Sequence, residues 1–236
     1  MVYKHQPDII MNNRAAAFCG PRTPEDKGPP SPEMFKMTRG DFGTPEQAVG
    51  NMDLTNSWES CITLVGGQWS WKPNGRMFSF ERTLDTLISC VTGGGNLLLN
   101  VGPMPTGEIE ERQVNLLKQV GDWIKPRAEA IYGTRGGPFR KGKWGGSTHK
   151  GNTVYVFAKE WREDNTLSLG VLPVKITAAK KLLDGTAVEF KQIDDGVDFT
   201  LPADKRDPNY TVIVLTLDKP VADGTLVQGK RPLPNL

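Results

Sequence analysis

An arginine and two carboxylates near the start of the chain are the side chains best suited to acid–base chemistry on a polar substrate. Arg14 follows a short apolar run, and Asp41 and Glu46 stand five residues apart in a segment rich in glycine. A positioned carboxyl group can give or take a proton during bond cleavage. Position alone favours plainer roles: a surface ion pair for Arg14, and a helix-terminus contact for Glu46 because Thr44 can cap a helix there.

A third carboxylate and several aromatic rings lie further along the chain. Glu59 follows Trp58 at the start of a predicted strand, where it can anchor hydroxyl groups or an arginine, or form an ion pair in the core. Trp69 and Trp71 alternate with a serine, so in an extended segment both rings point the same way. Such rings pack against sugars or fill cores, and the residues alone leave both uses open.

The composition argues against several other classes of protein. The 236 residues carry 29 Lys and Arg against 27 Asp and Glu, a net charge of +2 that gives no strong field for nucleic acid or anionic lipid. No window approaches the roughly 20 apolar residues of a membrane span, and the N-terminal residues show no apolar signal core. We expect a soluble protein that binds neither nucleic acid nor membrane; the sequence leaves its compartment open.

The cysteines and histidines offer little for metal or disulfide chemistry. Cys19, Cys61 and Cys90 are odd in number and widely spaced, which fits neither a disulfide framework nor a zinc site. His5 and His149 are far apart in the sequence and supply little for a metal site or a catalytic triad. We expect ordinary thiols, no metal and no cofactor.

Alternating strand and helix patterns predict an α/β arrangement in the first part of the chain. Apolar runs at 9–11, 58–65 and 96–101 predict short strands, the first buried and the last covered on both faces. Apolar residues at helical spacing predict a helix that Ser79 caps and that stops at Gly93.

A second helix is predicted from about 109 to 124, stopped by Pro126. Its inward residues are expected to be Val114, Leu117, Val120 and Ile124. Strand, helix, strand and helix in this order are typical of a parallel sheet with right-handed crossovers.

After residues 136–137 the pattern changes to short strand-like runs separated by turn residues. These runs fall at 153–158, 166–171, 174–177, 187–190, 197–201 and 210–217, with turns at 184–185 and 195–196. They predict an antiparallel β-sandwich, with 210–215 in the centre of its sheet because that run is apolar on both faces. The predicted domains are residues 1–137 and 138–236.

Several segments, taken together, resemble the α-L-fucosidases of glycoside hydrolase family 29. They are DIIMNNR at 8–14, GDFGTPEQ at 40–47, WE at 58–59, GGNLLLNVGP at 94–103, GDW at 121–123 and AIYGT at 130–134. Their order and spacing agree with the family over roughly residues 7 to 135. The predicted sandwich resembles the family's usual C-terminal domain.

The resemblance implies a barrel of the TIM type and a retaining hydrolase, with an aspartate nucleophile and a carboxylic acid as acid/base catalyst. On the matched positions, Glu46 resembles the acid/base catalyst of some members. Arg14 resembles the arginine that binds fucose, and Trp69 the aromatic residue that packs against the sugar. Trp58 and Glu59 match a family pair that we place among the substrate-binding residues.

Two features of the chain depart from the family. Asn13 stands where an aspartate is common, and the residues before Pro7 cannot hold the family's nucleophile motif and its fucose-binding histidines. The resemblance therefore predicts the last part of a (β/α) barrel, an α/β fold, followed by a small all-β sandwich. About 130 residues supply only three or four of eight barrel strands, which leaves unpaired backbone and an apolar layer exposed. We expect a homo-oligomer that buries this surface.

These inferences lead to one leading hypothesis. We expect removal of terminal α-L-fucose from glycosides or oligosaccharides, with Glu46 kept protonated so that it donates to the leaving oxygen. Asp41 is a candidate substitute nucleophile, and Glu59 or a group from a neighbouring subunit are other sources of the second carboxylate. A retaining pair needs a separation of about 5 to 5.5 Å. The rivals are a sugar-binding remnant without turnover, an assembly module, and a piece of a longer hydrolase.

Overall fold

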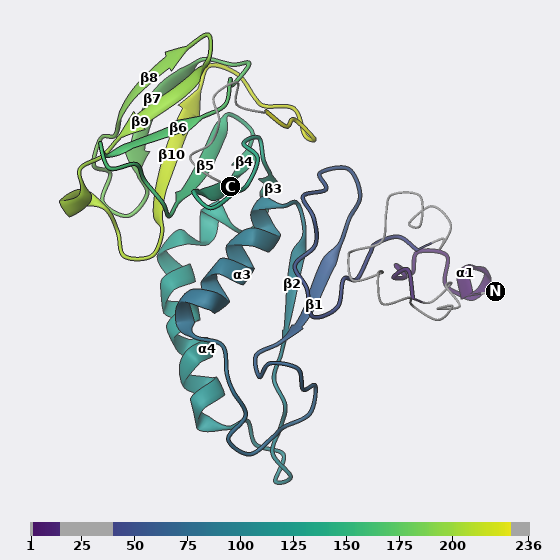
Figure 1. The fold of residues 1–236 in the computed structure, drawn as a ribbon. Helices are drawn as coiled ribbons and strands as arrows, with labels where there is room; N and C mark the ends of the chain where they lie inside the picture. The colour runs from purple at the N-terminus through teal and green to yellow at the C-terminus, as the bar shows by residue number, and fades with distance from the viewer. Residues whose placement is uncertain (1, 15–39, 228–236) are drawn as a thin grey trace.

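A computed structural model gives the architecture of residues 2–14 and 40–227 (Figure 1). After the short helix α1 (Val2–His5), the chain forms a parallel sheet with two long helices, and then two antiparallel sheets. Cys19 and most of the long loop predicted before Ser57 lie outside the described residues. Within the described ranges, no helix is both long and apolar enough to cross a membrane.

Four neighbouring segments of the first part form a parallel ladder. Strands β1 (Glu59–Thr63) and β2 (Asn96–Asn100) pair in parallel, which confirms the strands predicted at 58–65 and 96–101 with shorter bounds. Single parallel bridges add two more segments before β1: Asn12 with Phe42, Gly43 with Trp58, and Glu46 with Cys61.

Helix α3 (Phe80–Thr92) confirms the first predicted helix and its cap. The Ser79 side chain accepts a hydrogen bond from a backbone N–H of the first turn at 3.2 Å, and Gly93 ends the helix. Leu84 and Ile88 are almost completely buried. A good cap and one apolar face are enough to define this helix from the sequence.

Helix α4 (Glu111–Ile124) presents a different inward face from the one predicted. Its buried residues are Gln113, Leu116, Val120 and Trp123, whereas Val114, Leu117 and Ile124 are only partly buried. The large indole of Trp123 decides this rotation, because it packs edge-on against Tyr210 with ring centroids 6.3 Å apart. The α-helix ends at Ile124, and Pro126 lies in the 3₁₀ helix η1 (Lys125–Ala130) that follows.

Side chains alternate between the two faces of the parallel ladder. Ile62, Leu64 and Leu99 point into the apolar core that they share with α3 and α4, and Figure 1 shows both helices on one side of β1 and β2. On the other face, Leu98 is 44% exposed and Ile10 is 73% exposed. We call this second side the open face.

Two predictions of burial are therefore wrong. The run 96–101 is covered by helices on one face only, and the run 9–11 joins the ladder through a bridge at its end but is not a buried strand. An apolar run indicates a partner layer on both faces. For the described residues of this chain, that layer exists on only one of them.

The second part confirms the predicted antiparallel sandwich. Its first sheet has the order β3-β4-β5-β10-β7, formed by β3 (Arg135–Gly136), β4 (Gly145–Lys150), β5 (Thr153–Ala158), β10 (Thr211–Leu217) and β7 (Ile176–Lys181). The second has the order β6-β9-β8, formed by β6 (Thr166–Leu169), β9 (Gly196–Thr200) and β8 (Glu189–Ile193), with the short 3₁₀ helix η2 (Ala203–Lys205) after β9. Strand β10 lies between two neighbours, as its apolar pattern predicts.

Strands β3 and β4 are absent from the sequence-based prediction. The sequence of β4, GGSTHK, contains no large apolar residue, yet all but its last residue are buried. Helix α3 packs against it closely: a Cβ on Gly146 would collide with the Thr92 side chain. The buried glycines of β4 thus serve the close approach of a helix, which no local pattern reveals.

The five-stranded sheet contributes to two apolar cores. One face, with Phe157, Tyr210 and Val212, packs on α3 and α4 in the same core as Ile62. The other face packs on the three-stranded sheet, with Phe199 completely buried between them. The sandwich and the α/β part therefore share buried surface. The domain boundary after residue 137 stays a prediction.

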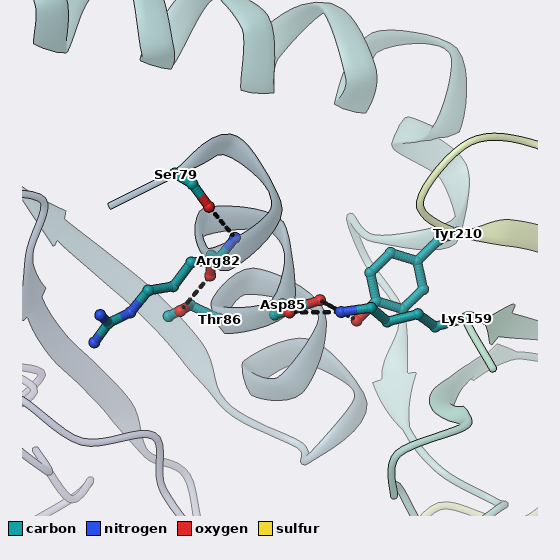
Figure 2. Close-up of polar contacts among 6 residues, drawn as sticks. All are labelled: Ser79, Arg82, Asp85, Thr86, Lys159 and Tyr210. Carbon is teal, nitrogen blue, oxygen red and sulfur yellow. Dashed lines mark hydrogen bonds and ion pairs between the residues drawn. The ribbon is translucent and has the colours of Figure 1, made fainter. Parts of the chain in front are cut away.

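A polar cluster also joins the two parts (Figure 2). Asp85 on α3 accepts bonds from the Lys159 ammonium at 2.6 Å to each carboxylate oxygen, and from the Tyr210 hydroxyl at 2.9 Å. Burial, with the bond to Asp85 as a second cause, raises the pKa of Tyr210 above its ordinary value. Lys141 makes a second connection, because its ammonium donates to the carbonyl oxygens of Gly50 and Ser89.

We expect Tyr210→Phe to lower the free energy of unfolding by about 1 kcal/mol, because Asp85 loses a donor at the junction. Urea denaturation at neutral pH measures this change. Tyr132→Phe is the matched control, since Tyr132 is 64% exposed, and it should leave the unfolding free energy unchanged. Equal stability of both variants and the native chain would show that the junction does not depend on this bond.

His149 on β4 is a buried titratable group without a hydrogen-bond partner. Its side chain is 1% exposed, and neither ring nitrogen makes a hydrogen bond within the described residues. Burial lowers the pKa of His149, and Asp223, whose carboxylate lies 4.0 Å away, opposes this only in part. Folding therefore favours the neutral imidazole.

The stability of the chain should fall as the pH falls below about 6.5, the ordinary pKa of an unfolded histidine. Below that pH the unfolded chain binds a proton at His149 that the folded chain resists. Urea denaturation of the native chain and of His149→Gln at pH 7.5 and 5.5 measures the effect. The native chain should lose more stability than the variant, and equal losses would contradict a buried neutral imidazole.

Candidate functional site

The register of the parallel ladder places several candidate side chains on the open face. Glu46 is the bridge partner of Cys61, and partners in a parallel pair point to the same side. Glu59 lies two residues before Cys61 and so shares its face, opposite to the helix-facing Ile62. Burial raises the pKa of Cys61; nearby Arg14 lowers it, and Glu46 and Glu59 raise it further. All three candidate charges thus surround one point of the open face.

Arg14 and Glu46 form an ion pair at this point. Arg14 Nη2 lies 2.7 Å from Glu46 Oε2, with the two side chains 42% and 32% exposed. The plainer role expected for Arg14, an ion pair, is thus present, and its partner is the other leading candidate. At this exposure the ion pair contributes little to the stability of the fold. Its main effect is to orient the Arg14 and Glu46 side chains.

Thr44 holds the same guanidinium from a second side. Arg14 Nε donates to the Thr44 hydroxyl at 2.9 Å, and Nη2 donates to the Thr44 carbonyl oxygen at 3.1 Å. The Thr44 hydroxyl in turn donates to Asn13 Oδ1 at 3.0 Å. Together these bonds fix the direction of the Arg14 side chain.

The helix cap considered for Thr44 is wrong. No helix follows it, and Gln47 has a φ of 55°, which breaks a helical course. Both a cap and a strand residue before proline have extended backbone, so the local sequence fits either structure. The parallel pairing with β1 decides between them, because the backbone of 43–47 bonds to that strand.

Asp41 does not lie beside Glu46. The segment between them follows the ladder, and five extended steps span roughly 16 Å between Cα atoms, with the two side chains on opposite faces. Asp41 Oδ2 accepts a hydrogen bond from the Met11 backbone N–H at 2.8 Å. This geometry differs widely from the separation of a retaining pair.

Glu59 is the carboxylate nearest to Glu46 in the register. It lies one strand across and two residues back, which places the two Cα atoms about 8 Å apart on the same face. Its side chain is partly buried and has no ion pair or hydrogen bond within the described residues. Two glutamates with different surroundings therefore share the open face.

The two tryptophans predicted at the site occupy different environments. Trp58 is 5% exposed and points to the helix side, where its ring packs against Gly95. Trp69 is 41% exposed, and its carbonyl oxygen accepts a bond from Asn100 Nδ2 at 2.9 Å, which anchors it at the carboxyl end of β2. The structure thus brings Arg14, Glu46 and Glu59 to one surface, with Trp69 at its edge and Trp58 in the core.

A hollow elsewhere in the described chain, between α3 and the five-stranded sheet, is lined by Asp85, Lys141 and Lys159, but all three are bound to protein groups. Within residues 2–14 and 40–227, no group of three or more His, Cys, Asp or Glu side chains could hold a metal ion.

Comparisons with known proteins agree with the motifs. The family model described as "Alpha-L-fucosidase" matches residues 26–129. The plasma α-L-fucosidase of Homo sapiens is 30% identical over 125 residues, which covers 50% of this chain and 27% of that protein. The tissue α-L-fucosidase of Bos taurus is 32% identical over 142 residues, covering 58% of this chain and 30% of that protein.

Solved structures extend the similarity through the sandwich. α-L-fucosidase isoenzyme 1 from Paenibacillus thiaminolyticus is 30% identical with a TM-score of 0.73, over 92% of this chain and 52% of that one. The Thermotoga maritima α-fucosidase, at 24% identity and a TM-score of 0.68, shares the fold over 91% of this chain and 46% of that one.

The chain thus spans about a third or less of the two curated relatives and about half of these two solved chains. The match nevertheless includes the motifs around Glu46, Glu59 and β2 as well as both structural parts. Motifs, family model and fold thus agree: over the matched residues the chain is similar to the α-L-fucosidases of glycoside hydrolase family 29.

Proposed function

We propose that this chain is the C-terminal part of a TIM-type barrel with its sandwich, and that it acts as a retaining α-L-fucosidase. Its substrate is a terminal α-L-fucose on a glycoside or oligosaccharide. The observation that carries the proposal is the convergence of Arg14, Glu46 and Glu59 on the open face. A cation next to two carboxyl groups can bind sugar hydroxyls and move a proton within one small area.

In this proposal Arg14 orients the sugar. Its Nε and Nη2 are engaged, while Nη1 has no partner in the described part of the chain and can donate to sugar hydroxyls. Trp69, half-exposed at the edge, packs against the sugar's apolar side.

Glu46 is the proposed proton donor. In the structure it is ion-paired with Arg14. When the sugar hydroxyls replace Glu46 as partners of Arg14, the carboxyl group is released to take up a proton from solvent and to face the glycosidic oxygen. The proton then passes to the leaving glycosidic oxygen.

Glu59 is the second candidate for this proton transfer. It faces the same surface and has no cationic partner within the described residues, so it can approach the glycosidic oxygen without an exchange of partners. In that arrangement Glu46 stays bound to Arg14 and holds the sugar with it. The nucleophile then comes from a carboxylate beyond this pair.

Variants separate these roles. We expect Glu46→Gln to lose about 10²–10⁴-fold in kcat/KM on α-L-fucosides with poor leaving groups, and much less on aryl α-L-fucosides, whose leaving groups need little proton donation. Glu59→Gln should show this pattern instead if Glu59 is the donor. A nucleophile variant loses activity on both substrates, and Asp41→Asn tests that role directly.

Glu163→Gln is the matched control, because Glu163 is exposed in the sandwich. It should keep full activity. Equal activity in all variants would reject every assigned role. Fucose binding by calorimetry without hydrolysis in any protein would instead favour the sugar-binding remnant.

We also propose that a second copy of the chain covers the open face. β2 pairs only with β1 within the described residues, so its other edge carries unpaired backbone groups, and Leu98 exposes apolar surface beside that edge. Ile10 is exposed at the opposite edge of the ladder. A second copy that packs on the open face and pairs with β2 buries Leu98 and the unpaired backbone groups.

Light scattering should give a mass above that of the 26.0 kDa chain at micromolar concentration. Leu98→Lys should shift the protein towards the monomer, because it places a charge in the buried contact. Leu183→Lys is the control: Leu183 is 40% exposed but lies in the sandwich, so the mass should not change. A stable monomer of the native chain would contradict the proposal.

A further inference from the structure

The contacts around Arg14 point to a residue that acts through it. Two of the three guanidinium nitrogens have partners. Nε donates to the Thr44 hydroxyl, and Nη2 contacts both the Thr44 carbonyl oxygen and the Glu46 carboxylate. Three short bonds on one edge of a planar group leave it a single orientation. The third nitrogen, Nη1, has no partner among the described residues.

Asn13 determines which way the Thr44 hydroxyl faces. A hydroxyl has one hydrogen, and here it is donated to Asn13 Oδ1 at 3.0 Å. The lone pairs of the oxygen are then directed to Arg14 Nε, which must donate. Asn13 thus makes Thr44 an acceptor, and it does so without a second negative charge beside Glu46.

The backbone places Thr44 for this task. Pro45 restricts the residue before it to extended conformations, and the bridges on either side keep the segment in the parallel ladder. Alternation then directs the Thr44 side chain to the same face as Glu46, two residues on. Thr44 is 9% exposed, so water competes little for its hydroxyl.

We propose that Thr44, with its hydroxyl oriented by Asn13, is the positioning residue that presents Arg14 Nη1 to the sugar. This inference rests on the proposed function for its ligand, since Arg14 is the group that contacts the fucose. The orientation itself is a property of the protein alone. Removal of the hydroxyl leaves Nε without an acceptor, so that only Nη2, with the Thr44 carbonyl oxygen and Glu46, still holds the guanidinium.

The first measurement needs no substrate. The Nε–H resonance of Arg14, assigned by its disappearance in Arg14→Lys, should exchange slowly with water in the native chain. Thr44→Val keeps the shape of the side chain but removes the hydroxyl, and exchange should become at least about tenfold faster. Thr44→Ser keeps the hydroxyl and should preserve slow exchange. Thr177→Val, in the sandwich, is the control and should change nothing.

The second measurement is fucose binding by calorimetry. Thr44→Val should weaken binding by roughly tenfold, the effect expected when one donor of a charged group loses its acceptor, and Thr44→Ser should restore it. In turnover the loss should fall on KM more than on kcat, because the hydroxyl does not touch the reacting bond.

The two measurements separate the two proposals. Unchanged Nε–H exchange in Thr44→Val overturns the positioning role, whatever the activity. Faster exchange in Thr44→Val with no fucose binding in the native chain supports the positioning role and overturns the proposed function. A melting curve of each variant confirms that the comparison is made on folded protein.

Discussion

The alternation of side chains across the parallel ladder is the constraint on which the candidate site depends. Ile62 and Leu64 must face the helices, because their burial with α3 and α4 supplies the core of this part. A slip of one residue would expose them and bury their charged neighbours, so the core sets the register strongly. Glu59 and Cys61 are thereby directed to the open face, and the bridge to Cys61 carries Glu46 with them. The apolar side of the sheet positions the polar side.

The sandwich supports this arrangement from behind. One face of its five-stranded sheet packs on the helices that back the parallel strands, and Asp85, Lys159 and Tyr210 add a polar connection at the same junction. A helix that is held on both sides cannot shift relative to the strands without breaking one of the two contacts. The second part of the chain therefore contributes to the precision of a site that it does not touch.

The sequence predicts well what depends on local patterns. The capped helix after Ser79, the strands β1 and β2 and the central position of β10 all follow from spacing, capping and composition. Prediction from the sequence fails where contacts with residues far along the chain determine which side chains are buried. The face of α4 follows the contact between Trp123 and Tyr210, and the burial of β4 follows its approach to Thr92.

The candidate site shows the same division. Its residue types indicate acid–base chemistry and the family resemblance implies a sugar substrate, but the grouping of Arg14 with Glu46, the distance of Asp41 and the contacts of Thr44 all depend on strand pairing. No pattern within a segment determines which segment lies beside it. Thr44 and Pro45 illustrate this, because a threonine followed by a proline is compatible with both a helix N-cap and an extended strand.

The open face links the chemistry of the site to what covers it. In the bare sheet Arg14 and Glu46 are each about a third or more exposed, so water screens their attraction and competes for their hydrogen bonds. A covering layer that buries Leu98 and Ile10 also removes water from the neighbouring charges, and each of their interactions becomes stronger at lower dielectric. In the proposed assembly, the contact that removes apolar surface from water therefore also strengthens the interactions of Arg14 and the two glutamates with the proposed sugar ligand. Under this proposal, assembly and reactivity depend on the same surface.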